Sequence, residues 1–215
     1  MELFFAPLAC SMSARIALAE AGAAIDLVGV DTHAKRVLTT GADYCAVNPL
    51  GYVPALKLDD GTVLTENSAI LQYIADQYPD AQLAPPASDR LGRAKLRQWL
   101  SFIGAELHKG LMTPLLGDKT PREVKAWAIS KYASRLAYLD AKLKGREFLL
   151  DRFSVADGYL ATVLNWTRAT PEIDLSLYPN VKAYLERMRA RPSVASALAT
   201  EIPLFHAEVA RRKAA

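Results

Sequence analysis

Short apolar runs and helical patterns alternate along the first third of the chain. Residues 2–6 are apolar and rich in aromatic side chains, which predicts a buried strand. Apolar residues recur at helical spacing over 11–21 and are followed by Gly22, which predicts a helix that ends there. Residues 25–31 alternate apolar and polar side chains, as a second strand does. This order predicts a βαβ unit with a parallel strand pair and a right-handed crossover.

Residues 54–66 have the pattern of a β-hairpin. Apolar and polar side chains alternate up to Asp59, and Asp60-Gly61 predicts a two-residue turn into a returning antiparallel strand. Residues 68–78 then have apolar side chains on one side of a predicted helix. The first part of the chain is therefore expected to be a βαβ–ββα domain over residues 1–79.

The composition changes at 79–89, where three prolines indicate a linker. No convincing strand pattern follows it, and the rest of the chain is expected to be an all-helical domain over residues 89–215. The predicted helices cover 90–113, 121–144, 154–169, 179–191 and, with a weaker pattern, 193–199.

Composition narrows the class of protein. A hydrophobic fraction of 51% and a charged fraction of 23% are ordinary for a soluble globular chain. Two cysteines and three histidines give neither a disulfide framework nor a zinc spacing, so no metal site is expected. The net charge is +3, and part of it comes from the basic residues at 211–213. The chain has no basic stripe with interleaved aromatic residues, so we do not expect it to bind nucleic acid. No apolar run approaches a membrane span, and we expect a cytoplasmic protein with reduced thiols.

Cys10 lies where the first strand gives way to the first helix. The positive dipole end of a helix and its free N–H groups stabilise a thiolate, so this position suits a reactive cysteine. Ser11 or Ser13 is expected to cap the helix through its hydroxyl. A buried cysteine that acts as a small hydrophobe is the alternative, and it is the preferred interpretation of Cys45, which has apolar neighbours.

The segment NPLGYVPAL at 48–56 combines a turn with a proline at the head of a strand. A cis Val53-Pro54 bond would leave the N–H and C=O of Val53 unpaired for a ligand, whereas a turn proline with only a structural role is the alternative.

The segment TENSAI at 65–70 places Glu66, Asn67 and Ser68 at the start of a helix. Free N–H groups there can bind a carboxylate, and Glu66 can pair with an ammonium group. An ordinary helix cap would explain the same residues.

These three segments, followed by a helical domain, resemble a glutathione transferase over nearly the whole chain. The resemblance implies a thioredoxin-like N-terminal domain and an all-α C-terminal domain. Ser154 and Asp157 are similar to the family's capping box. The segments Ala9-Cys10-Ser11 and ELHKG at 106–110 resemble the bacterial beta class, which uses a cysteine at the entry of the first helix.

The resemblance implies a role for particular side chains. Cys10 would lie beside the glutathione sulfur and could form a mixed disulfide with it. Ser11 and His108 would help to stabilise the bound thiolate, and Val53 would pair its backbone with the cysteinyl part. Lys35 would bind a carboxylate of glutathione, and Glu66 and Asn67 would bind the γ-glutamyl end. A neighbouring subunit would contribute contacts from one helix, at Ser101, Ala105 and Glu106, and Leu107 on the same helix is also an implied contact. Asn67, Ser101 and Ala105 depart from the residues usual in the family.

The pattern of the helix at 90–113 agrees with this assignment. One face is an apolar stripe, made up of Leu96, Leu100, Ile103, Leu107 and Leu111. Ser101, Gly104, Ala105 and His108 form a second face of small and weakly polar residues, which another helix or a ligand can approach closely. A lone histidine of this kind is more often solvated or satisfied within a core.

The expected function is conjugation of glutathione, as a co-substrate, to small hydrophobic electrophiles in detoxification, by a homodimer. A thiol-disulfide or peroxide side activity would use Cys10. Alternatives are a glutathione-dependent oxidoreductase or dehalogenase, and a non-catalytic binding or scaffold protein of the same fold. The acceptor site would draw on Met112, Leu115, Leu116, Tyr159 and Trp166.

Overall fold

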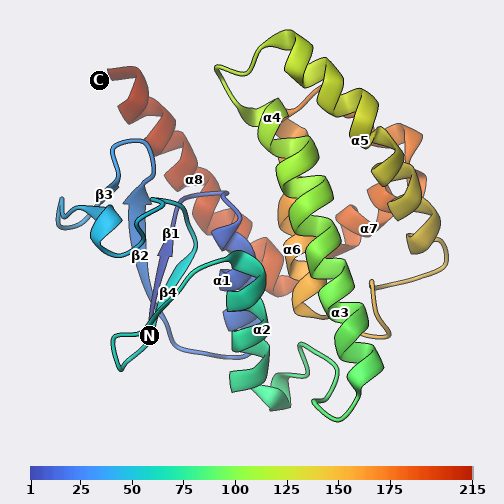
Figure 1. Cartoon of the computed structure of the whole chain (residues 1–215), viewed down its shortest axis with the longest axis horizontal. Helices are drawn as coiled ribbons and strands as arrows, with labels where there is room; N and C mark the ends of the chain where they lie inside the picture. The colour runs from blue at the N-terminus through green and yellow to red at the C-terminus, as the bar shows by residue number, and fades with distance from the viewer. Residues whose placement is uncertain (215) are drawn as a thin grey trace. The chain divides into compact units, whose positions relative to one another are not determined.

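The protein divides into two compact units. A computed structural model describes residues 1–214, without the side chains of Ala133 and Ala214. The first unit combines residues 1–83 with 191–215, of which 191–214 are described, and the second comprises residues 84–190. Figure 1 shows the strands and the labelled helices of both units.

The first unit contains a mixed five-stranded sheet in the order β3-β2-β1-β4-β5. Its strands are β1 (Glu2–Phe5), β2 (Asp26–Asp31), β3 (Arg36–Val37), β4 (Ala55–Lys57) and β5 (Val63–Leu64). β1 and β2 are parallel, with Leu3 opposite Leu27, which confirms the parallel pair expected from the βαβ pattern. β4 runs antiparallel to both β1 and β5. The short strand β3 had no distinct signal in the sequence.

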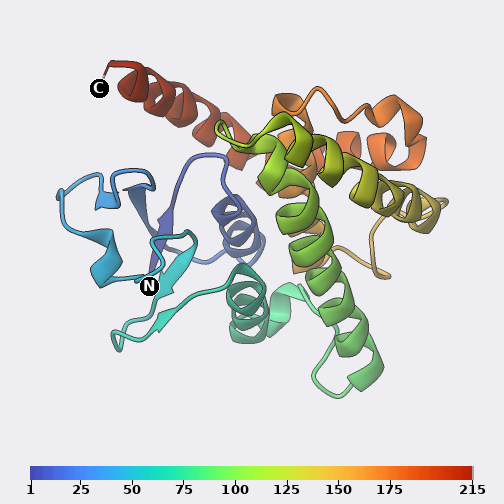
Figure 2. The same ribbon diagram turned by 45° about the horizontal axis from the view of Figure 1, so that its top comes forward.

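Two helices of the first unit, α1 (Ser11–Glu20) and α2 (Asn67–Gln77), lie on the same side of the sheet (Figure 2). Both have the predicted apolar faces, since Ile16, Leu18, Ile70 and Ile74 are buried. Gly22 has φ +63° just after α1, in the left-handed region that glycine adopts without strain. The thioredoxin-like N-terminal fold is confirmed.

The hairpin between β4 and β5 differs from the predicted two-residue turn. The Leu58 N–H donates to the Thr62 carbonyl at 2.8 Å, and the Gly61 N–H donates to the Leu58 carbonyl at 3.0 Å. The loop therefore has three residues, with Gly61 at φ +86° in the position where such loops need a left-handed residue.

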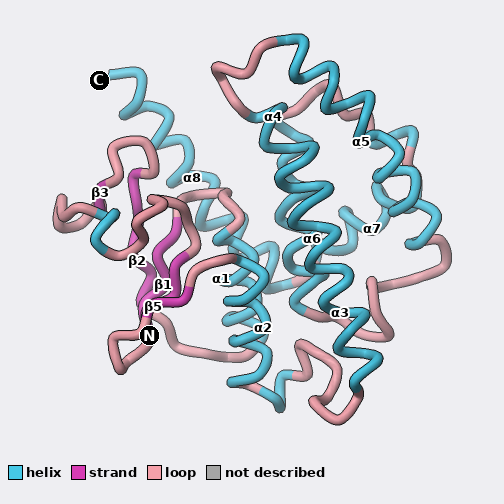
Figure 3. Tube along the Cα trace, viewed as in Figure 1, coloured by secondary structure: helices cyan, strands magenta, loops and turns pink. Residues whose placement is uncertain are grey.

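The second unit is built from helices, and Figure 3 shows no strand among its residues. Its helices are α3 (Arg90–Phe102), a π-helix (Ile103–Met112), α4 (Thr113–Leu116), α5 (Arg122–Leu143), α6 (Val155–Asn165) and α7 (Pro179–Ala190). The predicted apolar stripe of 90–113 is buried throughout. Within residues 1–214, no helix is both long and apolar enough to cross a membrane.

The helix predicted over 90–113 changes character at Ile103. From there to Met112 the backbone is a π-helix, in which the Thr113 N–H bonds to the His108 carbonyl five residues earlier. Gly110 makes room for a neighbour, because a Cβ there would lie 2.5 Å from Cε1 of Tyr132 on α5. Extended π-helices are rare and recur at functional sites, and sequence periodicity does not distinguish them from α-helices.

The last helix is longer than predicted and belongs to the first unit. α8 spans Pro192–Ala214, beyond the predicted 193–199, with Pro203 inside it. It packs against α1, where Arg191 and Ser193 bond to Glu20 and Glu201 bonds to Leu8. The domain division expected from sequence, with residues 89–215 all in the second domain, therefore differs from the structure in this final segment.

Candidate functional site

Cys10 is the N-cap residue of α1, and its side chain is half-buried. The Sγ–H donates to the carbonyl oxygen of Val53 at 3.2 Å. Two residues that are 43 positions apart in the chain, and that sequence analysis singled out separately, are thus in direct contact. The position at the head of a ten-residue helix places the sulfur in the positive end of the helix dipole.

The Val53-Pro54 peptide bond is cis. The loop before it is held at the Tyr52 carbonyl, which accepts hydrogen bonds from the Tyr44 hydroxyl at 2.8 Å and from Asn48 Nδ2 at 2.7 Å. Burial raises the pKa of Tyr44 to about 12, so this phenol stays protonated and donates. Among residues 1–214 the Val53 N–H has no hydrogen-bond partner, which leaves it available to a ligand.

Ser11 has a structural role in the loop before α1. Its side chain is 0% exposed. The hydroxyl donates to the Ala6 carbonyl at 3.2 Å and accepts from the Ala6 N–H at 3.3 Å. Ser11 therefore fixes the loop between β1 and α1. Neither Ser11 nor Ser13 caps α1 through its hydroxyl, because Cys10 occupies the cap position.

Asn67 joins the starts of α1 and α2. It is buried, and its side-chain amide exchanges hydrogen bonds with the Ser13 hydroxyl at 2.9 and 3.1 Å. Glu66 precedes it with an exposed side chain and φ +64°, a left-handed backbone that is strained for a residue other than glycine. Its carbonyl accepts the Ala69 and Ile70 N–H groups at 2.9 and 3.0 Å, so α2 begins here.

Lys35 lies against the loop that carries Val53. Its Nζ donates to the Gly51 carbonyl at 2.8 Å and lies 5.4 Å from the ring centroid of Tyr52. This approach requires glycine at position 51, because a Cβ there would lie 2.6 Å from Lys35 Cδ and 2.9 Å from Nζ. The glycine of the 48–56 motif is thus explained by a close approach as well as by its φ of +63°.

His108 lies in the second unit, in the middle of the π-helix. Its Nδ1 is 2.7 Å from the Tyr159 hydroxyl, and its ring lies edge-on to Trp166 with centroids 4.9 Å apart. Burial, helped by the charge of Lys109, lowers the pKa of His108 to about 4, so the imidazole is neutral near pH 7. If the phenol donates to Nδ1, the ring hydrogen is on Nε2. His108 can then assist a thiolate as a hydrogen-bond donor, but not as a cation.

The other residues of the segment 101–108 that the resemblance implied differ in how far they are exposed to solvent. Ser101 and Ala105 are exposed. Glu106 forms an ion pair with Arg135 on α5, with 2.7 Å between Oε2 and Nε. Leu107 is 0% exposed and belongs to the apolar core.

Part of the expected acceptor site is also buried. Met112, Leu115 and Tyr159 are at most 3% exposed, so these side chains fill the core of the second unit in place of lining an open site. Leu116 is 37% exposed, and Trp166 is half-buried. These two remain the candidates for contacts with an apolar acceptor.

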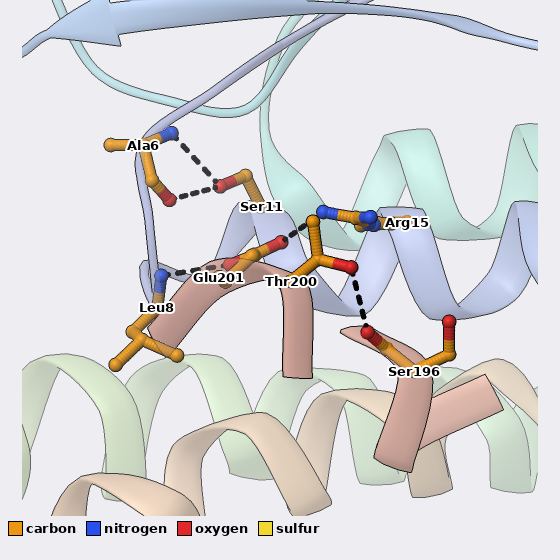
Figure 4. A network of polar contacts seen from close by, with 7 residues as sticks. All are labelled: Ala6, Leu8, Ser11, Arg15, Ser196, Thr200 and Glu201. Carbon is orange, nitrogen blue, oxygen red and sulfur yellow. Dashed lines mark hydrogen bonds and ion pairs between the residues drawn. The ribbon is translucent and has the colours of Figure 1, made fainter. Parts of the chain in front are cut away.

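Glu201 on α8 is a site-supporting residue that sequence analysis missed. Figure 4 shows its carboxylate beside the loop that leads to Cys10, where it accepts from the Leu8 N–H at 2.8 Å and from Arg15 Nη1 at 3.4 Å. Leu8 has φ +56°, so the carboxylate holds a strained turn. A signal was available: Glu201 continues the buried spacing of Val194 and Ala197, and a carboxylate at a core position needs partners.

Comparison with known proteins identifies the family. Residues 9–77 match the glutathione S-transferase N-terminal domain, and residues 104–192 match the C-terminal domain of the same family. The chain is 45% identical over 202 residues to glutathione S-transferase GstA of Escherichia coli O157:H7, covering 94% of this chain and 98% of that protein. It is 34% identical over 209 residues to glutathione S-transferase GST-4.5 of Xanthomonas campestris, again with 94% and 98% covered.

Solved structures agree with this assignment. A ternary complex of BphK, a bacterial glutathione transferase, is 45% identical with a TM-score of 0.89, over 94% of this chain and 99% of that one. The beta-class glutathione S-transferase of Sphingomonas chungbukensis is 48% identical with a TM-score of 0.87, over 94% and 98%. With both domains matched and nearly the full length aligned, the resemblance noted in the sequence is confirmed, and the chain belongs to the glutathione S-transferase family.

Proposed function

We propose that this chain conjugates the thiolate of glutathione to small hydrophobic electrophiles. The observation that carries the proposal is the local geometry at Cys10. A thiol at the mouth of α1 lies 3.2 Å from the Val53 carbonyl, beside a Val53 N–H that is available to pair with a peptide ligand. The 45% identity to a glutathione S-transferase over nearly the full length supports the same conclusion.

The first unit offers a partner for each end of glutathione. The first-turn N–H groups of α2 and the carboxylate of Glu66 suit the α-carboxylate and the ammonium of the γ-glutamyl end. Lys35 Nζ, now bonded to the Gly51 carbonyl, suits the glycyl carboxylate. Val53 receives the cysteinyl backbone, and the sulfur then lies near Cys10 and the positive end of α1. From the second unit we propose that His108 donates a hydrogen bond, while Ser101, Ala105 and Glu106 contact glutathione in a neighbouring subunit.

The protein's task is to favour thiolate at neutral pH. The bound thiol loses its proton to solvent, and the resulting anion is stabilised by the helix dipole and by nearby hydrogen-bond donors. The thiolate then attacks the electrophilic carbon of an acceptor such as a chloronitrobenzene. A carbon–sulfur bond forms, the carbon–chlorine bond breaks, and chloride leaves with the electron pair.

A second activity, thiol-disulfide exchange, is favoured by Cys10 itself. Its thiolate can attack glutathione disulfide, forming a mixed disulfide and releasing one glutathione thiolate. A second glutathione thiolate then attacks the mixed disulfide and restores Cys10. The cytoplasm is the compartment that suits this chemistry, because neither Cys10 nor Cys45 forms a disulfide and a reducing environment keeps both as thiols.

Replacement of Cys10 by alanine is expected to separate the two activities. Mixed-disulfide formation, measured by mass spectrometry after incubation with glutathione disulfide, should disappear. Conjugation of a chloronitrobenzene should persist within about tenfold of wild type, because the helix dipole and the Val53 backbone remain. Cys45→Ala is the matched control, since Cys45 is the other free, half-buried thiol, and it should leave both activities unchanged.

Two outcomes would contradict these assignments. If Cys10→Ala leaves disulfide exchange intact, Cys10 has no redox role. If the wild-type protein neither binds immobilised glutathione nor conjugates the chloronitrobenzene, the chain is a scaffold of the same fold.

We also propose that the chain acts in detoxification as a homodimer. Small exposed residues at Ser101 and Ala105 permit close approach, and α5 exposes large apolar side chains at Trp127 and Tyr138. Sedimentation at micromolar concentration should give twice the 23.5 kDa mass of the chain. A single species of 23.5 kDa would exclude the dimer.

A further inference from the structure

The second unit contains a cavity of about 310 Å³ that the proposed chemistry does not use. Its lining comes from the 3₁₀ turn Trp166–Ala169 after α6, from residues 173–176, which lead into the 3₁₀ turn Leu175–Leu177, and from α7. This volume falls in the range of small-molecule sites. None of the residues assigned above to glutathione or to the acceptor lines the cavity.

Arg189 is the central cation of the cavity. Its Nε donates to the Asn165 side-chain oxygen at 2.7 Å, and Asn165 is itself buried at the end of α6. A neutral amide thus orients the guanidinium without neutralising it. Among residues 1–214 its two terminal nitrogens have no hydrogen-bond partner, so they are available to a ligand.

Arg168 brings a second guanidinium to the same cavity. The pKa of Arg189 is lowered, first by burial and then by the positive charge of Arg168, while the charge of Glu186 opposes both effects. No carboxylate of the described residues lies within ion-pair distance of either arginine. Guanidinium groups with available donors that line one cavity suit a planar carboxylate or a phosphate.

The lining also contains two acidic residues, Asp174 and Glu186. Asp174 accepts the Ser176 N–H at 2.8 Å, and its pKa is lowered by this contact with Ser176 and by the charge of Lys182. Glu186 is exposed on α7, one helical turn after Lys182 and three residues before Arg189, whose pKa its charge raises. Lys182 therefore offsets part of this negative charge, and the three cations outnumber the two acids in the lining.

The lining also has an apolar part, made up of Ile173, Leu175 and Leu185. Ile173 is 8% exposed and Leu185 is 2% exposed, and both line the cavity. An occupant that covered them would gain from burial of its own apolar surface. The combination of an apolar wall and paired guanidinium groups favours a ligand with one charged head and one apolar body.

We propose that this cavity binds a small organic anion, with a carboxylate or phosphate group on Arg168 and Arg189 and an apolar body against Ile173 and Leu185. The site is separate from the glutathione chemistry, and the proposal stands independently of it.

Calorimetric titration of the full chain with phenyl phosphate, benzoate and inorganic phosphate tests the site. We expect saturable binding of the two aromatic anions, weaker binding of inorganic phosphate because it lacks the apolar body, and loss of affinity as sodium chloride is added. The tighter of phenyl phosphate and benzoate identifies the preferred head group. Saturating glutathione should leave the affinity unchanged.

Variants assign the binding to the two arginines. Arg189→Gln and Arg168→Gln should each weaken binding of the tighter ligand by about tenfold or more. Arg168 is exposed and makes no hydrogen bond to the described residues, so Arg168→Gln retains a fold even if Arg189→Gln does not. Arg146→Gln, an exposed arginine of the same unit outside the cavity, is the control and should bind as wild type does. Unchanged affinity in Arg168→Gln, absence of saturable binding, or displacement by glutathione would overturn the proposal.

Discussion

Replacement of Asp157 by alanine should lower the free energy of unfolding by about 3 to 5 kcal/mol, enough to remove much of the stability of an average domain. Asp157 is 0% exposed at the start of α6. Its Oδ1 accepts the Leu149 N–H at 2.9 Å and the Tyr184 hydroxyl at 2.8 Å. Its Oδ2 accepts the N–H and the hydroxyl of Ser154, each at 2.9 Å. Alanine would leave these buried donors without an acceptor.

Urea unfolding, followed by circular dichroism, measures the effect. Asp157→Asn should recover only part of the loss, because its amide nitrogen cannot accept the two Ser154 donors. The control is Asp89→Ala at the exposed N-cap of α3, where one bond to the Gly92 N–H is lost and about 1 kcal/mol is expected. A cost at Asp157 no larger than the cost at Asp89 would contradict this account of the capping box.

Glu201 should make the protein less stable as pH rises from 4.5 to 7. Burial raises the pKa of this carboxyl from 4.5 to about 7, against the opposing effects of the Leu8 N–H and Arg15. The native state therefore holds the proton more tightly than the unfolded chain does. The stability that this proton contributes is complete below pH 4.5 and is lost as pH rises through 7. With 1.36 kcal/mol for each pKa unit, the loss amounts to about 3 kcal/mol.

Two substitutions separate the charge of Glu201 from its hydrogen bond. Glu201→Gln carries no charge and can still accept the Leu8 N–H. Its free energy of unfolding should therefore lack this component of the pH dependence. At pH 8 the variant should be at least as stable as wild type. Glu201→Ala loses the acceptor as well and should be less stable at every pH by about 1 to 3 kcal/mol. The control is Glu172→Gln, at an exposed carboxyl of the second unit.

Urea unfolding between pH 4.5 and 8 provides the comparison. Because other titrating groups are common to all the variants, the difference between wild type and Glu201→Gln isolates this carboxyl. Parallel curves for these two proteins would mean that the pKa of Glu201 is not raised in the native state.

Much of the fold followed from apolar periodicity, because burial determines where strands and helices form. The predicted elements were incomplete where apolar periodicity alone does not determine the structure. β3 is only two residues long, too short to have a pattern of its own. α8 continues through Pro203, which reads as a helix breaker in the sequence but is accommodated inside the helix. The π-helix has the same apolar stripe as an α-helix, and the close approach of Tyr132 to Gly110 beside it has no local pattern in the sequence.

The candidate site was predictable where a local motif sets the geometry. The position of Cys10 at a helix start and the Val53-Pro54 motif each had a sequence signal, and the structure brings them into contact. The Ser11 hydroxyl bonds to the backbone of Ala6, a contact that the sequence does not reveal, because a hydroxyl at a helix start is equally able to face a ligand or to satisfy a buried backbone group. Leu107 faces the core, as its own apolar stripe had indicated.

The return of α8 to the first unit has a consequence for the order of biosynthesis. The Leu8 N–H donates to the carboxylate of Glu201, which lies 193 residues further along the chain. A ribosome therefore releases nearly the entire polypeptide before the loop in front of Cys10 can gain its last hydrogen bond. Contacts between residues so far apart in the chain form slowly, because closing the long loop between them costs entropy. The loop in front of Cys10 is therefore synthesised early but reaches its final structure late.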